Sequence, residues 1–139
     1  MTKRTEKRAQ FLKDVLVTAV ESYGYTPWFQ FDNYNPDNGT VTVYHDENED
    51  GEYSDGPYQI NLDDVARGLR LYREAWADPP TYTSPTTGET TLMYPARNTG
   101  SYRYQLLVAD RTNGDDGDFD VTTADSVLQM AVLGKEIYG

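Results

Sequence analysis

The spacing of apolar residues predicts a helix at the start of the chain, over residues 3–22. Apolar residues recur there at intervals of three and four positions, which places them on one stripe of a helix. Gly24 follows this segment and is expected to end the helix. The stripe, which we expect to pack in the core, consists of Leu12, Val15, Leu16, Ala19, Val20 and Tyr23.

The pattern then changes to the alternation of apolar and polar residues that is typical of β-strands. In the first predicted strand, Phe29 and Phe31 share one face and Trp28 lies on the other. Residues 33–39 end in Asn-Gly, a dipeptide that favours a hairpin turn. An antiparallel meander is therefore expected, with strands at Tyr25–Asp32, Thr40–His45 and Tyr58–Asn61.

A second helix is predicted at Leu62–Trp76, with Asn61 or Asp63 as its N-cap. It carries a row of arginines beside its apolar stripe. Such a row can bind phosphate, but it is more often a solvated helix face with i,i+4 ion pairs such as Asp63 to Arg67. The row consists of Arg67, Arg70 and Arg73.

The last helix is predicted to begin near Thr122, with Thr122 as N-cap and Asp125 as the acidic partner in a capping box. Residues 101–110 fit a strand by alternation or a short helix. We favour the helix, because it would place both apolar segments on one core. The last helix is apolar nearly all round, which predicts burial; its apolar residues are Val127, Leu128, Met130, Ala131, Val132, Leu133 and Ile137.

Residues 78–100 are poor in apolar side chains and rich in Thr, Pro and Gly. This composition predicts a long loop or mobile arm, with a weak strand at Thr90–Tyr94. The 139 residues are expected to form a single domain, 1–139. The fold class that follows is α+β: an N-terminal helix, a short antiparallel β-meander, a middle helix and a buried C-terminal helix.

The charges are unbalanced and segregated along the chain. The formal net charge is −11, and Asp14–Ala66 contains twelve Asp and Glu residues but no Lys or Arg. Such a field repels nucleic acid and acidic membranes, and it attracts basic partners or cations; acidity that only keeps a protein in solution is the alternative. The first helix is basic instead, and we expect its cations to dock against the protein's own acidic loops.

Several chemistries are excluded or disfavoured. The chain has no cysteine, which excludes disulfides, thiolate metal sites and cysteine nucleophiles. It shows neither a signal-peptide pattern nor an apolar stretch of the roughly 20 residues that a membrane span needs. The sequence motifs of phosphate-binding loops, zinc proteases, serine hydrolases and dinucleotide-binding enzymes are missing.

His45 is the single histidine. Together with Asp46 it could supply a general base and an orienting carboxylate, although a lone surface histidine at a strand end is the commoner case. We therefore expect a protein that is not an enzyme, and an enzyme of unknown class that uses His45 stays an alternative.

The loop after the second predicted strand is the main candidate site. It combines closely spaced carboxylates with aromatic side chains, and an exposed aromatic patch with Trp28 and Tyr44 is expected beside it. Such a surface suits contact with a basic protein and not direct contact with nucleic acid. The candidate partner-binding residues are Asp46, Glu47, Glu49, Asp50, Glu52 and Asp55, with Tyr44 and Tyr53 beside them.

The same loop resembles the opening of an EF-hand calcium loop, with Gly51 at the position of the sharp turn. The match then fails, because Pro57 occupies the position of the bidentate glutamate. A second acidic loop, between Asn113 and Thr122, resembles a dockerin loop without keeping its register; a capped, acidic helix entry is the alternative reading there. No cofactor is expected except calcium, whose candidate ligands are Asp46, Asn48, Asp50, Asp116, Asp118 and Asp120.

Three segments resemble small acidic proteins encoded by actinobacterial phages and mobile elements. They are Phe11–Ala19, Asn61–Tyr72 and Asp110–Gly139. The likeness covers about half of the chain, mainly its helices, and the group supplies no function to carry over. The resemblance implies a phage or mobile-element accessory protein that acts in the cytoplasm of a bacterial host. With the charge pattern, we expect a protein that binds a basic host protein and whose carboxylates stand in for nucleic-acid phosphates.

Overall fold

The computed structural model describes residues 4–22, 28–75, 81–92 and 102–138. The order of its elements confirms the predicted α+β class, with an N-terminal helix, a three-stranded antiparallel sheet and a C-terminal helix. In chain order the elements are α1 (Glu6–Glu21), β1 (Phe29–Asn35), β2 (Thr40–His45), β3 (Asp55–Ile60), α2 (Leu62–Ala75), β4 (Thr81–Thr83), β5 (Thr90–Leu92), α3 (Tyr102–Thr112) and α4 (Val121–Leu133).

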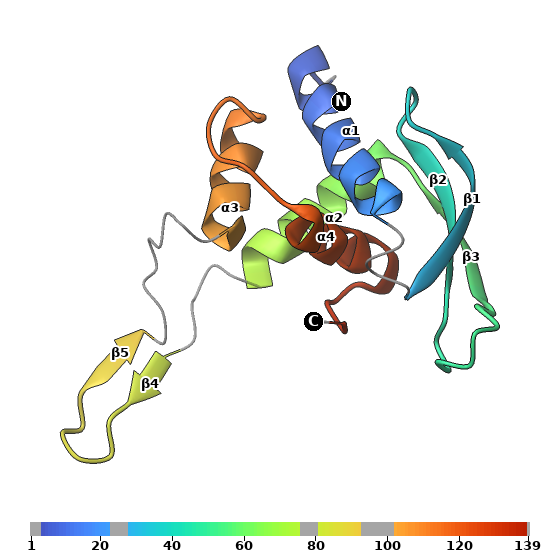
Figure 1. Ribbon diagram of the computed structural model, residues 1–139. Helices are drawn as coiled ribbons and strands as arrows, with labels where there is room; N and C mark the ends of the chain where they lie inside the picture. The colour runs from blue at the N-terminus through green and yellow to red at the C-terminus, as the bar shows by residue number, and fades with distance from the viewer. Residues whose placement is uncertain (1–3, 23–27, 76–80, 93–101, 139) are drawn as a thin grey trace.

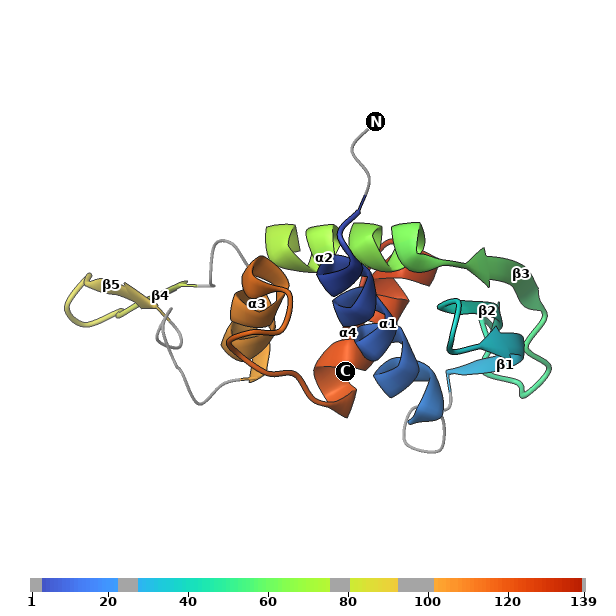
Figure 2. The same ribbon diagram turned by 90° about the horizontal axis from the view of Figure 1, so that it is seen from above.

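Helices α1, α2 and α4 form the centre of the molecule, with the sheet β1–β3 on one side and α3 on the other (Figure 1, Figure 2). None of the helices in the described ranges is long and apolar enough to cross a membrane. Side chains from the three central helices, the sheet and α3 meet in one core, which includes Leu12, Leu16, Phe29, Val43, Leu69, Leu106 and Val127.

Helix α1 begins later than the predicted residue 3, because the hydroxyl of Thr5 accepts a hydrogen bond from the backbone N–H of Arg8 at 3.1 Å and caps the helix. Tyr23 and Gly24 lie outside the described residues. The remaining predicted stripe is buried, and Phe11 joins it; the buried residues are Phe11, Leu12, Val15, Leu16, Ala19 and Val20.

Arg4, Lys7 and Arg8 pair with the protein's own acids, but only Lys7 pairs, as expected, with an acidic loop. Arg8 forms an ion pair with the buried carboxylate of Asp110 at 2.8 Å, and it also donates to the Asp110 backbone carbonyl at 2.9 Å. These contacts fasten α1 to α3. Further pairs join this region to the start of α2 and to the loop after α3: Arg4 with Asp63 at 2.7 Å, and Lys7 with Asp115.

The sheet has the strand order β1-β2-β3, and both pairs are antiparallel. The predicted hairpin is present, but β1 runs on to Asn35, which still pairs with Thr40, and β3 begins at Asp55 instead of Tyr58. Gly39 in the connecting turn has φ 70°, and a Cβ there would lie 2.4 Å from Leu62 Cδ2. The positive φ of this turn therefore favours glycine, and a side chain there would also displace the end of the Leu62 side chain.

Trp28 lies in the core, so the prediction of an exposed aromatic patch around it is wrong. It is 6% exposed, and its indole N–H donates to Asp125 of α4 at 2.7 Å. Because β1 begins only at Phe29, the alternation of the strand does not extend to Trp28. The indole instead stacks on the ring of Tyr138, with 6.2 Å between ring centroids.

Helix α2 is capped by a reciprocal pair of hydrogen bonds. The Asn61 side-chain oxygen accepts from the N–H of Asp64 at 3.1 Å, and Asp64 accepts from the N–H of Asn61 at 2.9 Å. Asn61, and not Asp63, is therefore the cap. Gly68 lets α2 approach α4 closely, since a Cβ there would lie 2.5 Å from the Val127 carbonyl oxygen.

The arginines of α2 bind acids of this protein, in agreement with the expectation of a salt-bridged face. Arg67 pairs with Asp64 at 2.8 Å and donates to the Ala131 carbonyl at 2.6 Å. The predicted pair of Asp63 with Arg67 is wrong, because Asp63 pairs with Arg4. The two other pairs are Arg70 with Glu74 at 3.3 Å, and Arg73 with Asp110 at 3.2 Å.

Residues 81–92 form a two-stranded hairpin instead of a loop with one weak strand. Thr83 of β4 lies opposite Thr90 of β5, and Gly88 in the turn has φ 73°. Residues 76–80 and 93–101, which contain Trp76 and the rest of the predicted strand, lie outside the described residues. The helix predicted over residues 101–110 is confirmed as α3.

Helix α4 is buried on all sides over residues 123–131, as predicted. Its N-cap is Asp120 and not Thr122: Asp120 accepts from the N–H of Thr123 at 2.8 Å, and the Thr123 hydroxyl accepts from the N–H of Asp120 at 3.0 Å. Asp125 therefore lies beyond the capping box, where it is buried and accepts hydrogen bonds from Trp28 and from Gln129.

Candidate functional site

The connection between β2 and β3, residues 46–54, is held in shape by its own aspartates; we call it the acidic loop. The two carboxylate oxygens of Asp46 accept from the backbone N–H of Gly51 at 3.1 Å and 3.2 Å. The backbone carbonyl of Asp46 accepts from the N–H of Glu49 at 3.1 Å. Asp50 accepts from the N–H of Glu52 at 3.0 Å. These bonds satisfy backbone groups within the loop, so its conformation is set before any partner arrives.

The predicted partner-binding carboxylates fall into two groups. Asp46 and Asp55 are half-buried and serve the fold. Asp46 caps the loop, and Asp55 accepts from the Tyr58 hydroxyl at 2.8 Å and lies 3.2 Å from His45 Nδ1. The four others are exposed, and within the described residues none of them forms an ion pair with Lys or Arg: Glu47, Glu49, Asp50 and Glu52.

Of the two predicted tyrosines, only Tyr53 belongs to the acidic loop, and the hydroxyl of Tyr44 is directed away from that loop. Tyr44 is half-buried and precedes the loop by two residues, and its hydroxyl donates to Asp32 at 3.5 Å. Tyr53 lies within the loop, half-buried, with φ 50°. Aromatic rings next to exposed carboxylates form a surface of mixed character, which is the composition that protein interfaces favour.

Charge is segregated in space as well as in sequence. Residues 28–60, which form the sheet and its loops, contain no Lys or Arg. The ion pairs that involve Lys or Arg lie instead between and within the helices and their connections, away from the sheet. The sheet lies at one end of the molecule (Figure 1), and its sequence makes this the acidic end; its carboxylates are Asp32, Asp37, Asp46, Glu47, Glu49, Asp50, Glu52 and Asp55.

The field of the acidic loop reaches the C-terminal segment. The pKa of Tyr138 is raised, first by burial and then by the negative charges of Glu49, Asp46 and Glu47. The pKa of Tyr58 is raised mainly by its hydrogen bond to Asp55. The carboxylates of the acidic loop are thus a secondary cause of the shift at Tyr138, after burial.

His45 is buried at 5% exposure, contrary to the expectation of a surface histidine. The carboxylate that orients it is Asp55 and not Asp46, and its Nε2 lies 2.8 Å from the hydroxyl of Tyr138. Both ring nitrogens are therefore engaged. In this arrangement the imidazole joins β2 and β3 to the C-terminal segment and has no free nitrogen to offer a substrate.

The second acidic loop contributes mainly to the entry of α4. Asp118 accepts from the N–H of Phe119 at 2.8 Å, and Asp120 caps the helix. The acidic helix entry agrees with the alternative to calcium, although its cap is Asp120 and not the predicted Thr122. The backbone N–H of Asp116 donates a hydrogen bond to the hydroxyl of Thr112, and this hydroxyl donates to the backbone carbonyl of Asp116. In the described parts of the chain, no three His, Asp or Glu side chains come together to hold a metal ion. Calcium binding by either loop stays a prediction.

Several residues around the site were not expected from the sequence. Tyr138 contacts His45 and Trp28, although it lies 93 positions from His45 along the chain. No local sequence pattern predicts this contact. A pocket at the opposite end of β2 also went unpredicted; the alternation of polar residues at Thr40 and Thr42 is the sequence signal that could have revealed it.

No protein-family model matches the chain, and neither a curated protein sequence nor a solved structure matches it.

Proposed function

We propose that this protein is not an enzyme and that it binds a basic protein through the acidic loop. The observation that carries the proposal is the contrast between the two kinds of charge. The arginines and the lysine of the ion pairs neutralise acids on the helices and on the segments that follow α3 and α4, whereas the exposed carboxylates of the acidic loop have no cationic partner among the described residues; these carboxylates are Glu47, Glu49, Asp50 and Glu52.

The geometry of the loop supports a binding role. Uncompensated like charges on one loop oppose its compact conformation, so the loop is held by the bonds of Asp46 and Asp50 to the backbone. A loop that is already ordered loses less conformational entropy when a partner binds. Exposed carboxylates of this kind accelerate encounter with a cationic surface, and the effect weakens as salt is added.

The partner that we propose is a nucleic-acid-binding protein of a bacterial host, and the carboxylates would occupy the place of phosphates. The resemblance of the helices to small acidic phage proteins supports this setting. On this proposal the protein is an accessory protein of a phage or mobile element, active in the host cytoplasm.

Salt-resolved capture tests the proposal. The tagged protein is incubated with an actinobacterial lysate, bound proteins are eluted with a salt gradient, and each eluted protein is then assayed for competition with duplex DNA. A basic protein that elutes within the gradient and is displaced by DNA supports the proposal. If the captured proteins all stay bound at high salt, the proposal is contradicted.

A further inference from the structure

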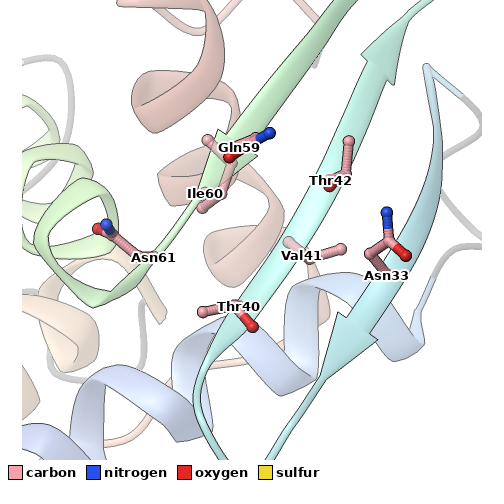
Figure 3. Close-up of a pocket in the computed structure, with 7 residues that line it drawn as sticks. All are labelled: Asn33, Thr40, Val41, Thr42, Gln59, Ile60 and Asn61. Atoms are coloured by element: carbon pink, nitrogen blue, oxygen red, sulfur yellow. The ribbon is translucent and has the colours of Figure 1, made fainter.

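An open pocket of about 340 Å³ lies on the sheet, at the end of β2 opposite the acidic loop (Figure 3). The volume is at the lower end of the range of small-molecule sites, roughly 300–1,000 Å³. Thr42 and Gln59 lie opposite each other in the strand register and alternate with the buried Val41 and Ile60, so they point away from the core. The lining residues are Asn33, Thr40, Val41, Thr42, Gln59, Ile60 and Asn61.

The lining is uncharged, although the sheet around it is the acidic end of the molecule. Asp32 lies opposite Thr42, but its carboxylate accepts from the Asn33 side chain at 3.2 Å and from the Tyr44 hydroxyl. The carboxylate of Asp32 is therefore engaged by neighbouring side chains. A site without charged lining residues favours a ligand without charge.

The side chains of the pocket offer both donors and acceptors. The Asn33 amide nitrogen donates to Asp32, which leaves its oxygen as an acceptor. The Asn61 oxygen accepts from the N–H of Asp64, which leaves its amide nitrogen as a donor. Gln59 supplies one group of each kind. A cation would use only acceptors and an anion only donors, so this mixed set matches hydroxyl groups, which donate and accept at once.

Thr42 places a hydroxyl in the pocket. The residue is 9% exposed and faces the open side of the sheet. It stands between Asn33 on β1 and Gln59 on β3 (Figure 3), where its hydroxyl can donate a hydrogen bond to a ligand hydroxyl and accept one from it.

We propose that this pocket binds a small uncharged polyol of the mono- or disaccharide class. The pocket lies across the face of three strands and not along a strand edge, so it does not suit a peptide added as a fourth strand. The site is separate from the acidic loop, and its occupation does not depend on the proposed function.

The test is a titration of the whole protein with glucose and with N-acetylglucosamine, followed by NMR of the side-chain amide groups. The amide signals of Asn33, Gln59 and Asn61 are expected to shift and to saturate with at least one of the sugars. Glycerol at the same molar concentration controls for a general effect of polyols.

Two variants locate the site. Thr42→Val keeps the branched shape and removes the hydroxyl, and Gln59→Ala changes an exposed side chain that the core does not need. Each is expected to weaken sugar binding by a factor of roughly 2 to 10, the contribution of one hydrogen bond. Gln30→Ala, an exposed residue of β1 outside the pocket, should leave binding unchanged. Unshifted amide signals with both sugars, equal shifts with glycerol, or unchanged affinity in both pocket variants would overturn the proposal.

Discussion

The carboxylate of Asp125 accepts a hydrogen bond from the indole N–H of Trp28 at 2.7 Å, across 97 positions of the chain. Its second oxygen accepts from Gln129 Nε2 at 2.8 Å. Both Asp125 and Trp28 are buried, so this contact ties the start of the sheet to the middle of α4 inside the core. A buried carboxylate is tolerated only where donors of this kind surround it.

Asp125→Ala is expected to lower the free energy of unfolding by about 3 kcal/mol, because it leaves the donors of Trp28 and Gln129 without this acceptor. Asp125→Asn keeps one acceptor oxygen and should lower the free energy of unfolding by less, about 1 kcal/mol. Urea unfolding followed by circular dichroism measures both values. Asp116→Ala, at an exposed position, is the control; equal stability of the control and of Asp125→Ala would refute the structural role of this carboxylate.

Gly68→Ala is expected to destabilise the protein, although alanine normally favours a helix by about 1 kcal/mol over glycine. The new Cβ would lie 2.5 Å from the Val127 carbonyl oxygen and 3.2 Å from Ala131 Cβ, so α2 and α4 must move apart. Overpacking of this kind costs roughly 1–3 kcal/mol. The melting temperature should fall; a rise would contradict the close approach of the two helices.

Gln129 is expected to hold the C-terminal segment in place. Its side-chain oxygen accepts from the N–H groups of Ile137 and Tyr138 at 2.9 Å each, and its amide nitrogen donates to the Tyr138 carbonyl at 2.9 Å. Gln129→Ala removes these bonds, so amide hydrogen exchange at residues 137–138 should accelerate more than in the middle of α1. Gln129→Met keeps the length of the side chain without these hydrogen bonds and should accelerate the exchange as well. Unchanged exchange in both variants would count against the contact.

Alkaline pH is expected to destabilise the protein in part through Tyr72. Burial, partly offset by Arg103, raises its pKa from the ordinary 10.0 to about 12. Because the folded-state pKa is the higher one, the neutral phenol contributes stability below pH 10, and this contribution is lost as pH rises from 10 to 12. In Tyr72→Phe, the fall in the free energy of unfolding over that interval should be smaller, by on the order of 2 kcal/mol. An identical fall in both proteins would show that the pKa of Tyr72 does not differ between the folded and unfolded states.

Local patterns predicted the helices well, because an apolar stripe is encoded within a few turns of one segment. The stripe of α1 and the burial of α4 were both read from such spacing. The helix α3 was favoured for a tertiary reason, a shared core, and Leu106 is indeed buried. The exact caps were harder: Asp120 and Thr122 are both good cap residues, and only the structure distinguishes them.

The errors concern residues whose roles depend on distant partners. The N-cap of α4 is two residues earlier than predicted, so Asp125 is a buried hydrogen-bond acceptor and not part of the capping box. Trp28 was placed outside because the strand was expected to include it. For the candidate site, the sequence located the acidic loop, but it did not show which of the candidate carboxylates are half-buried and which are exposed. The half-buried carboxylates are engaged by Gly51 and Tyr58, and these pairings arise from the turn and the strand register.

The central claim, that the acidic loop binds a basic protein, is tested most directly by two variants with the same change in charge. In the loop variant, Glu47, Glu49, Asp50 and Glu52 become the corresponding amides. In the control variant, four exposed carboxylates outside the sheet become amides: Glu6, Asp14, Glu89 and Asp116.

Both variants raise the net charge from −11 by the same amount, and both should melt within a few degrees of the parent protein. The measurement is the amount of the salt-eluted lysate protein that each variant retains at low salt. The loop variant is expected to lose it and the control variant to keep it. Equal retention by the two variants, or equal loss, would contradict a binding site at the acidic loop.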